Sequence, residues 1–189
     1  MPGILRLPGG VAGGRHVQGT LGLVDVTATL LDVAGLDATG LDGRSARADI
    51  EEGKAHDRDV YAESMYGRLH FGWSDLTAVT RGGLRYIRAP RPELYDLSTD
   101  PGERQNLAAT RASTAAPLAA WLTQITAGAV STEPQPIPAD VSQRLKSLGY
   151  VGSSGAPLSS STAKLADPKD GIASFEAFKK ALAIERAAS

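Results

Sequence analysis

The 189-residue sequence contains no cysteine, which excludes disulfide bonds, thiolate metal ligands and cysteine nucleophiles. Aromatic residues make up only 5% of the chain, so a hydrophobic core must consist mainly of Leu, Val, Ile and Ala. No run approaches the ~18 apolar residues that a membrane-spanning helix needs. The first eight residues also lack the basic leader and apolar run of a secretory signal.

An excess of charge of one sign is missing as well. The chain has 20 basic and 21 acidic residues and a net charge of −1. Because phosphate contacts need a clustered excess of Lys and Arg, no nucleic-acid partner is expected. Apolar residues at 42% and charged residues at 22% are typical of a globular protein.

Local motifs for metal binding and nucleophilic catalysis are absent from the sequence. The three histidines, His16, His56 and His70, lie too far apart to form a local ligand motif. The sequence contains no HExxH, calcium-loop or GxSxG pattern. A metal site or catalytic centre formed by this chain alone is therefore not expected.

The first third of the chain predicts one strand, one helix and a polar loop. Residues 3–7 form a short apolar run that is typical of a buried strand. Residues 25–34 have helical apolar spacing, with Asp25 as the expected N-cap and Gly35 as the left-handed stop. The polar stretch 49–59, which contains His56, is interpreted as a solvated loop.

The middle of the chain predicts a small antiparallel sheet. Four short β-prone runs occur at residues 60–64, 76–80, 84–87 and 94–97. Only Arg81-Gly82-Gly83 separates the second run from the third, which indicates a tight hairpin.

A helix over residues 113–127 is expected to cover one side of this sheet. Its apolar face would comprise Leu118, Trp121, Leu122 and Ile125, at i, i+3, i+4 and i+7 spacing. Trp121 on this face and Tyr95 in the preceding strand are predicted to be core residues.

The last third has a different composition. Residues 129–166 are rich in Pro, Ser and Gly and are interpreted as a linker that contains a short helix. Asp167 and Pro168 then form a favourable helix start. The apolar stripe of this last helix needs a partner surface and comprises Ile172, Phe175, Phe178 and Leu182.

One segment, residues 66–73, combines Arg68, His70, Trp73 and two glycines in a predicted loop. An imidazole and a guanidinium together suit an oxyanion such as sulfate or phosphate. The segment is therefore a candidate substrate-binding loop. Alternatively, Phe71 and Trp73 anchor a surface loop by packing while His70 faces water.

Three consecutive motifs resemble the C-terminal signature of the sulfatase family, in the alkaline-phosphatase-like superfamily. Residues 41–45 and 23–31 are similar to the turn and the capped helix that precede this signature, and the resemblance spans about residues 2–127. From their types, the signature residues look structural rather than catalytic. They are Glu93-Leu94-Tyr95-Asp96-Leu97, Asp100-Pro101-Gly102-Glu103 and Asn106-Leu107-Ala108.

The resemblance implies an α/β fold of the alkaline-phosphatase type, represented here by an α+β portion. Residues 1–58 would end the catalytic α/β domain, and residues 59–128 would form the four-stranded antiparallel sheet with its covering helix. Residues 129–166 would be the linker. Because residues 144–152 resemble a segment that precedes helical repeats, residues 167–189 would begin a tetratricopeptide-like array.

The resemblance also implies chemistry that this chain does not contain. The family uses a formylglycine made within a Cys/Ser-x-Pro-x-Arg motif, and that motif is absent here. The divalent cation, calcium or magnesium, is held by residues upstream of the region that the resemblance covers. The chain therefore looks like the C-terminal portion of a sulfate-ester hydrolase, incomplete without an N-terminal catalytic region. In the intact enzyme, Arg68, His70 and Trp73 would border the substrate.

Two other functions remain open at this stage. The chain could be a non-catalytic binding or scaffold module. It could also belong to a related phosphodiesterase or phosphonate hydrolase, because the C-terminal signature is partly shared across the superfamily. Many members of the family are exported, and the compartment of this protein stays open.

Overall fold

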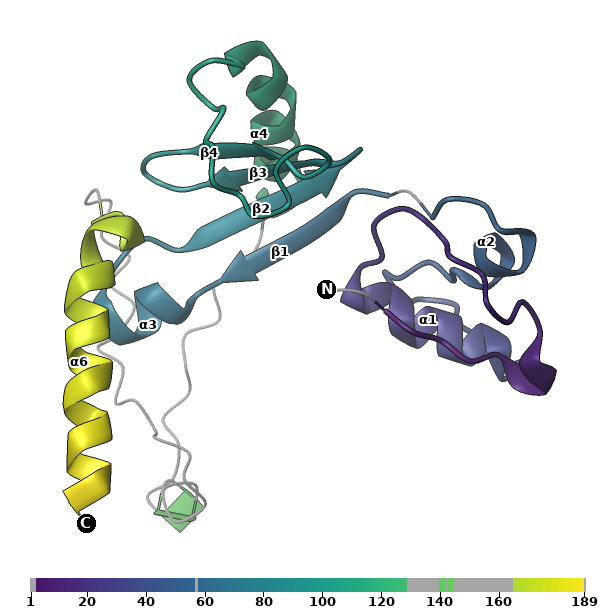
Figure 1. Ribbon diagram of the computed structural model, residues 1–189, viewed down its shortest axis with the longest axis horizontal. Helices are drawn as coiled ribbons and strands as arrows, with labels where there is room; N and C mark the ends of the chain where they lie inside the picture. The colour runs from purple at the N-terminus through teal and green to yellow at the C-terminus, as the bar shows by residue number, and fades with distance from the viewer. Residues whose placement is uncertain (1–2, 57, 129–139, 142, 145–164, 189) are drawn as a thin grey trace. The chain divides into compact units, whose positions relative to one another are not determined.

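The structure is a computed structural model that describes residues 3–56, 58–128, 140–141, 143–144 and 165–188 (Figure 1). The chain divides into two compact units, and the boundary between them passes through the strands of a sheet. The first unit comprises Met1–Ala62, Ala78–Tyr86 and Leu94–Leu118. The second unit comprises Glu63–Thr77, Ile87–Glu93 and Ala119–Ser189.

Helix α1, Leu23–Val33, confirms the first predicted helix but begins two residues earlier than expected. Gly22 is the N-cap, and Asp25 occupies the third helical position. The prediction that Asp25 is the N-cap residue is therefore wrong. Its carboxylate still contributes to the helix start, because it accepts the N–H of the N-cap residue Gly22 at 2.8 Å. Gly35 ends the helix with φ of 70°, as predicted, and Leu36 N–H donates to the Leu31 carbonyl at 2.9 Å.

Two predictions for the N-terminal region are wrong. Residues 3–7 form no strand and lead into the short 3-10 helix η1, Pro8–Gly10. Within the described part of the chain no strand pairs with them, and an apolar run without a hydrogen-bonding partner does not form a ladder. The expected solvated loop at 49–59 instead contains the end of helix α2, Arg47–Glu52, and a buried His56.

The four predicted strands are confirmed. They are β1 (Val60–Ser64), β2 (Leu76–Arg81), β3 (Leu84–Arg88) and β4 (Glu93–Asp96). They form one antiparallel sheet in the order β1-β2-β3-β4. The β2–β3 hairpin turns at Gly82-Gly83, where both residues have positive φ, as a type I′ turn requires.

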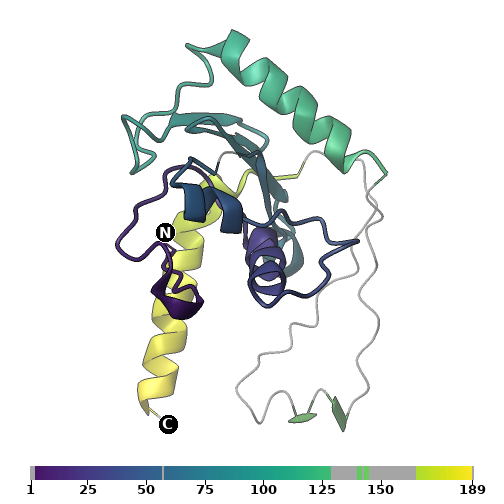
Figure 2. The same ribbon diagram turned by 90° about the vertical axis from the view of Figure 1, so that its right-hand side faces the viewer.

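Helix α4, Ala112–Thr126, confirms the predicted helix after the sheet. Leu118 and Leu122 are buried, whereas Trp121 is only half-buried and Ile125 is 42% exposed, so the buried face is narrower than expected. Pro117 lies inside the helix, and the helix remains continuous along its length (Figure 2).

The predicted core position of Tyr95 is confirmed, because this side chain is buried in β4. Leu94, its neighbour on the same strand, is fully buried, as is Val79 of β2. Leu94 and Tyr95 are successive residues of β4, so their side chains point to opposite faces of the sheet. Both are buried, so the sheet is covered on both faces at this point.

Two helices of the second unit lie side by side, α3 (Tyr66–Phe71) and the long α6 (Pro168–Ala188) (Figure 1). Helix α3 replaces the loop predicted for residues 66–73, and Gly72 ends it in the left-handed region, with φ of 68°. Asp167 caps α6 as predicted, since its carboxylate accepts the Lys169 N–H at 2.9 Å.

The predicted linker at 129–166 lies mostly outside the described residues, and the segment 144–152 beyond Arg144 lies wholly outside them. The side chain of Leu182 is likewise not described. A repeat array beginning at α6 stays a prediction. No helix in the described ranges is long and apolar enough to cross a membrane.

Candidate functional site

The three predicted substrate residues lie on and just after α3, in two different environments. Arg68 and His70 belong to the last turn of the helix, and Trp73 follows its C-cap, Gly72. His70 is exposed, and its ring lies 4.3 Å from the ring of Tyr66, which is also exposed. Arg68 is half-buried. The structure thus gathers His70 and Tyr66 on the accessible side of the helix.

Trp73 lies against α6. Its ring stacks on Phe71, with centroids 4.5 Å apart, and Phe71 in turn contacts Phe175 edge-on at 5.6 Å. A Cβ atom at Gly171 would overlap the Trp73 ring, so the glycine is what lets the indole lie on the helix backbone. This is the packing arrangement foreseen as the alternative for Phe71 and Trp73. It fixes the position of α3 and therefore of His70.

A group of charged residues anchors the start of α6 to the β3–β4 connection. Arg91 Nη2 lies 2.7 Å from Asp170 Oδ1, and the backbone N–H of Arg91 donates to Asp167 at 2.9 Å. Lys169 Nζ donates to Glu93 at 2.6 Å. The hydrogen bond from Arg91 lowers the pKa of Asp170. The side chains of Arg91 and Asp170 are more than half exposed, so each pair contributes little by itself, and the network acts by fixing geometry.

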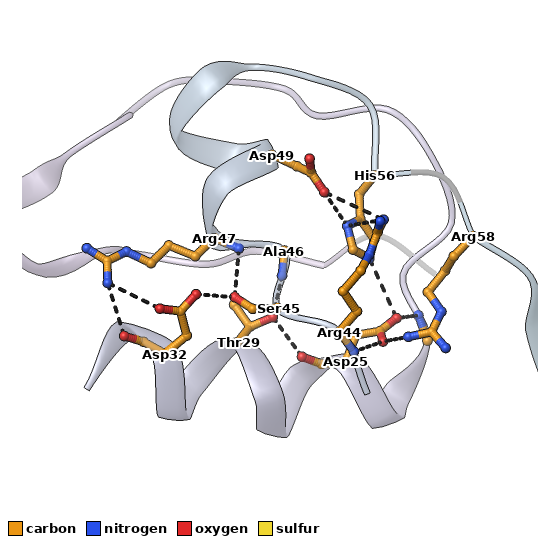
Figure 3. Close-up of polar contacts among 11 residues, drawn as sticks. Asp25, Thr29, Asp32, Arg44, Ser45, Ala46, Arg47, Asp49, His56 and Arg58 are labelled. Carbon is orange, nitrogen blue, oxygen red and sulfur yellow. Dashed lines mark hydrogen bonds and ion pairs between the residues drawn. The ribbon is translucent and has the colours of Figure 1, made fainter. Parts of the chain in front are cut away.

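Sequence reasoning missed a second cluster, which centres on Asp25 in the first unit (Figure 3). The Asp25 carboxylate is fully buried and accepts the backbone N–H groups of Gly22 at 2.8 Å and Arg44 at 2.9 Å. It also accepts a hydrogen bond from the Arg58 guanidinium. Burial raises the pKa of Asp25, but these hydrogen bonds and the charges of Arg58 and His56 outweigh it and leave the pKa below its ordinary value.

The loop at residues 41–45 reaches this carboxylate because Gly43 has no side chain. A Cβ atom there would overlap the carbonyl group of Val24. The loop backbone can therefore lie directly on the first turn of α1, which brings the Arg44 N–H to Asp25. The sequence did contain a sign of this contact. Gly43 precedes Arg44 in the LDGRS-like turn, and a glycine can mark a point where two backbone segments approach closely.

A second arm of the cluster joins the start of α2 to α1 (Figure 3). Thr29 donates to the Asp25 carbonyl at 2.7 Å and accepts the Ala46 N–H at 3.0 Å. Ser45 donates to the Asp32 carboxylate at 2.5 Å, and Arg47 donates to the Asp32 carbonyl at 3.0 Å. The arrangement is a closed set of hydrogen bonds, so its role is to hold the two helices together.

His56 completes the cluster and is buried between the two helices (Figure 3). Its Nδ1 lies 2.7 Å from Asp49 Oδ2, and its Nε2 lies 3.7 Å from Asp25 Oδ2. The hydrogen bond with His56 lowers the pKa of Asp49. The backbone of His56 is fixed as well, because its N–H donates to the Gln18 carbonyl at 2.9 Å.

The family-like signature residues make turn and strand contacts. Leu94 N–H donates to the Asn106 side chain at 3.1 Å, and Leu107 N–H donates to the Leu94 carbonyl at 2.8 Å. The Asp100 carboxylate accepts the N–H groups of Arg104 and Gln105, both at 2.8 Å.

The remaining signature residues act in the same way. Asp96 accepts the Ser98 hydroxyl at 2.5 Å, and Glu103 pairs with Arg85. Glu103 N–H donates to the Asp100 carbonyl at 3.1 Å, which closes the turn over Pro101 and Gly102. These contacts hold the segment after β4 against the strand, and a structural role for the signature residues stays a prediction.

A divalent cation, which the sequence resemblance implies for an intact enzyme, has no ligand set in the described ranges. No group of three or more His, Asp or Glu side chains there could hold a metal ion. The buried Asp25 carboxylate already accepts hydrogen bonds from Gly22, Arg44 and Arg58. The residues in the described ranges therefore do not fit the cation.

Comparison with known proteins gives structural neighbours only. No protein-family profile matches the sequence, and no curated protein matches it. The phosphonate monoester hydrolase of Agrobacterium radiobacter is similar at 27% identity over 62% of this chain and 27% of its own, with a TM-score of 0.48. A putative sulfatase from Bacteroides thetaiotaomicron is similar at 25% identity over 55% of this chain and 24% of its own, with a TM-score of 0.44.

The 2-O GAG sulfatase BT1596 gives the same figures as the putative sulfatase: 25% identity, 55% and 24% coverage, and a TM-score of 0.44. The chain spans about a quarter of the length of the solved structures that it matches. Its structural neighbours are thus sulfatases and a phosphonate monoester hydrolase, at low identity and over little more than half of this chain.

Proposed function

We propose that this chain is the C-terminal portion of a sulfatase-like hydrolase that cleaves sulfuric esters, and that it carries no catalytic centre itself. The observation that supports this most is the segment after β4. The third family-like motif folds back on the first, which forms β4, through hydrogen bonds among Leu94, Asn106 and Leu107. The residues that resemble the family thus contact one another in the structure, which supports the proposal.

The chemical inventory of the chain supports the second half of the proposal. Attack on an inert sulfate ester requires an activated nucleophile, which the family derives from a Cys/Ser-x-Pro-x-Arg motif. The sequence contains no such motif. In the proposed enzyme the nucleophile and the cation come from a catalytic region outside these residues.

The role proposed for this chain in the reaction is substrate contact from α3. His70 and Tyr66 form an accessible pair on the helix. Arg68 lies with His70 in the last turn of the same helix. His70 can donate a hydrogen bond to a substrate hydroxyl or to a sulfate oxygen. Trp73 contributes by holding α3 on α6, through Phe71 and Gly171.

The test compares the chain alone with the product of its extended reading frame, made in a host that matures formylglycine. Each is incubated with an aryl sulfate, an aryl phosphate and a phosphonate monoester, with calcium or magnesium present. The chain alone should give no turnover, and the extended protein should hydrolyse the aryl sulfate. Turnover by the chain alone that survives repurification would refute the proposal.

The same assay separates the two alternatives. An extended protein that prefers the phosphonate monoester belongs to the related hydrolases of the superfamily. An extended frame without any nucleophile motif, and without turnover on the three esters, indicates a binding or scaffold module.

A further inference from the structure

The sequence contains two Asp-Gly pairs, Asp42-Gly43 and Asp170-Gly171. In such a pair the amide nitrogen of the glycine can attack the carboxyl group of the aspartate and close a five-membered succinimide ring. Glycine favours this reaction because it has no side chain to shield the nitrogen or to restrict the backbone. The structure places the two pairs in different surroundings, so they should differ in reactivity.

The first pair, Asp42-Gly43, lies in the irregular connection between α1 and α2, and Asp42 is exposed there. Within the described ranges, neither the Asp42 carboxylate nor the Gly43 N–H has a hydrogen-bond partner. The two groups that must meet are therefore not engaged elsewhere. The irregular backbone also contains no helical or ladder hydrogen bond that ring closure would have to break.

The second pair, Asp170-Gly171, is held by its surroundings. It lies in the first turn of α6, where the helical backbone keeps the carboxyl carbon of Asp170 away from the next amide nitrogen. Both carboxylate oxygens of Asp170 accept hydrogen bonds from Arg91, at 2.7 and 3.0 Å. Gly171 packs directly under the Trp73 ring. Ring closure here would require the turn to unwind and these contacts to break.

We propose that Asp42-Gly43 is a site of spontaneous isoaspartate formation in the folded chain, and that Asp170-Gly171 is protected from the same reaction. The Gly43 nitrogen bonds to Cγ of Asp42 and loses its proton, the protonated carboxyl group loses its hydroxyl, and the two leave as water. A second water molecule then opens the ring. Opening at the α-carbonyl restores an acid there and leaves the backbone running through Cγ, which is isoaspartate. This reaction is separate from the proposed hydrolase function.

The modification would act on the cluster around Asp25. Isoaspartate at residue 42 adds one carbon atom to the backbone immediately before Gly43. At Gly43 the loop lies on the carbonyl group of Val24, with no room for even a Cβ atom. The next residue, Arg44, donates its N–H to Asp25 at 2.9 Å. A longer backbone at residue 42 displaces both contacts, so isoaspartate detaches the loop at 41–45 from α1.

The direct test is peptide mapping of the full chain after incubation for weeks in native buffer and, in parallel, in urea. Trypsin releases the two pairs in separate peptides, 16–44 and 170–179, and electron-transfer fragmentation distinguishes isoaspartate from aspartate. In native buffer the isoaspartate fraction at residue 42 should rise while that at residue 170 stays at its starting value. In urea both fractions should rise, because the helix no longer protects residue 170. A fraction at residue 42 that rises no faster than that at residue 170 in native buffer would overturn the proposal.

The second readout is hydrogen exchange of the Arg44 amide in the isoaspartate-containing fraction, separated by ion-exchange chromatography. The protection factor of this amide should fall at least about tenfold, because its hydrogen bond to a charged acceptor is lost. The matched control is Asp42→Glu, which keeps the charge but would have to close a six-membered ring, a much slower reaction. After equal incubation this variant should keep the protection. Unchanged protection in the isoaspartate fraction, or an equal loss in Asp42→Glu, would contradict the proposed effect on the cluster.

Discussion

Replacement of Asp25 by Asn tests whether the buried carboxylate is what holds together α1, the loop at 41–45 and Arg58, which precedes β1. The change keeps the size of the side chain and removes its charge. It also replaces one acceptor oxygen by an NH₂ donor. If that group takes the place of Oδ2 it faces the Gly22 N–H, and if it takes the place of Oδ1 it faces Arg44 and Arg58. Either orientation sets donor against donor.

The expected loss follows from these contacts. A hydrogen bond to a charged group contributes about 1.5–3 kcal/mol, and the removal of one partner from a buried ion pair costs about 3–5 kcal/mol. Because the three contacts share one carboxylate, they do not add independently. We expect Asp25→Asn to lower the free energy of unfolding by about 3–5 kcal/mol, which is a large part of a typical domain's stability.

Urea unfolding at pH 7, followed by circular dichroism, measures this loss. Asp42→Asn is the matched control, since Asp42 is exposed in the adjacent loop and its change should stay within about 0.5 kcal/mol. The pKa of Asp25 is lowered in the folded state, so its stabilisation is complete above about pH 4 and is lost as pH falls further. An unchanged urea midpoint in Asp25→Asn would refute the reasoning.

Three further predictions follow from packing and from the proposed site. Leu94→Ala should cost about 2–5 kcal/mol in urea unfolding, whereas Ile4→Ala, at a 99% exposed position, should cost almost nothing; equal effects would contradict the core assignment. Gly171→Ala should push α6 away from Trp73 and speed hydrogen exchange in α6, and unchanged exchange would show that the contact is dispensable. In the extended hydrolase, His70→Ala should raise KM while Tm holds; a fall in activity that only follows lost stability would make α3 structural.

The strands could be predicted from the sequence because their signals are local. Each strand carries its own β-prone residues, and Gly82-Gly83 specifies the turn between β2 and β3 by its backbone conformation. The start of α6 was predictable for the same reason, since Asp167 and Pro168 act within one turn of the helix.

The errors arose where structure depends on distant residues. The glycines and aromatics of residues 66–73 suggested a loop, but their aromatic side chains pack against Phe175 of α6, and the segment is helical. His56 looked like a solvated residue because nothing in its neighbourhood shows that its backbone bonds to Gln18. The apolar run at residues 3–7 satisfied the pattern of a strand, but pattern alone supplies no hydrogen-bonding partner.

The attachment of α6 has a consequence for the order of assembly. Its hydrogen bonds to Arg91 and Glu93 join residues 76 to 79 positions apart, whereas the hairpins close between neighbouring strands. Contacts of long sequence separation form late in folding. Phe175 lies about 100 residues after Phe71. At a synthesis rate of about 5–20 residues per second, Phe175 is therefore added roughly 5–20 s after Phe71. During that interval the aromatic side chains of α3 lack their cover, and the nascent chain presents a surface that a chaperone can bind.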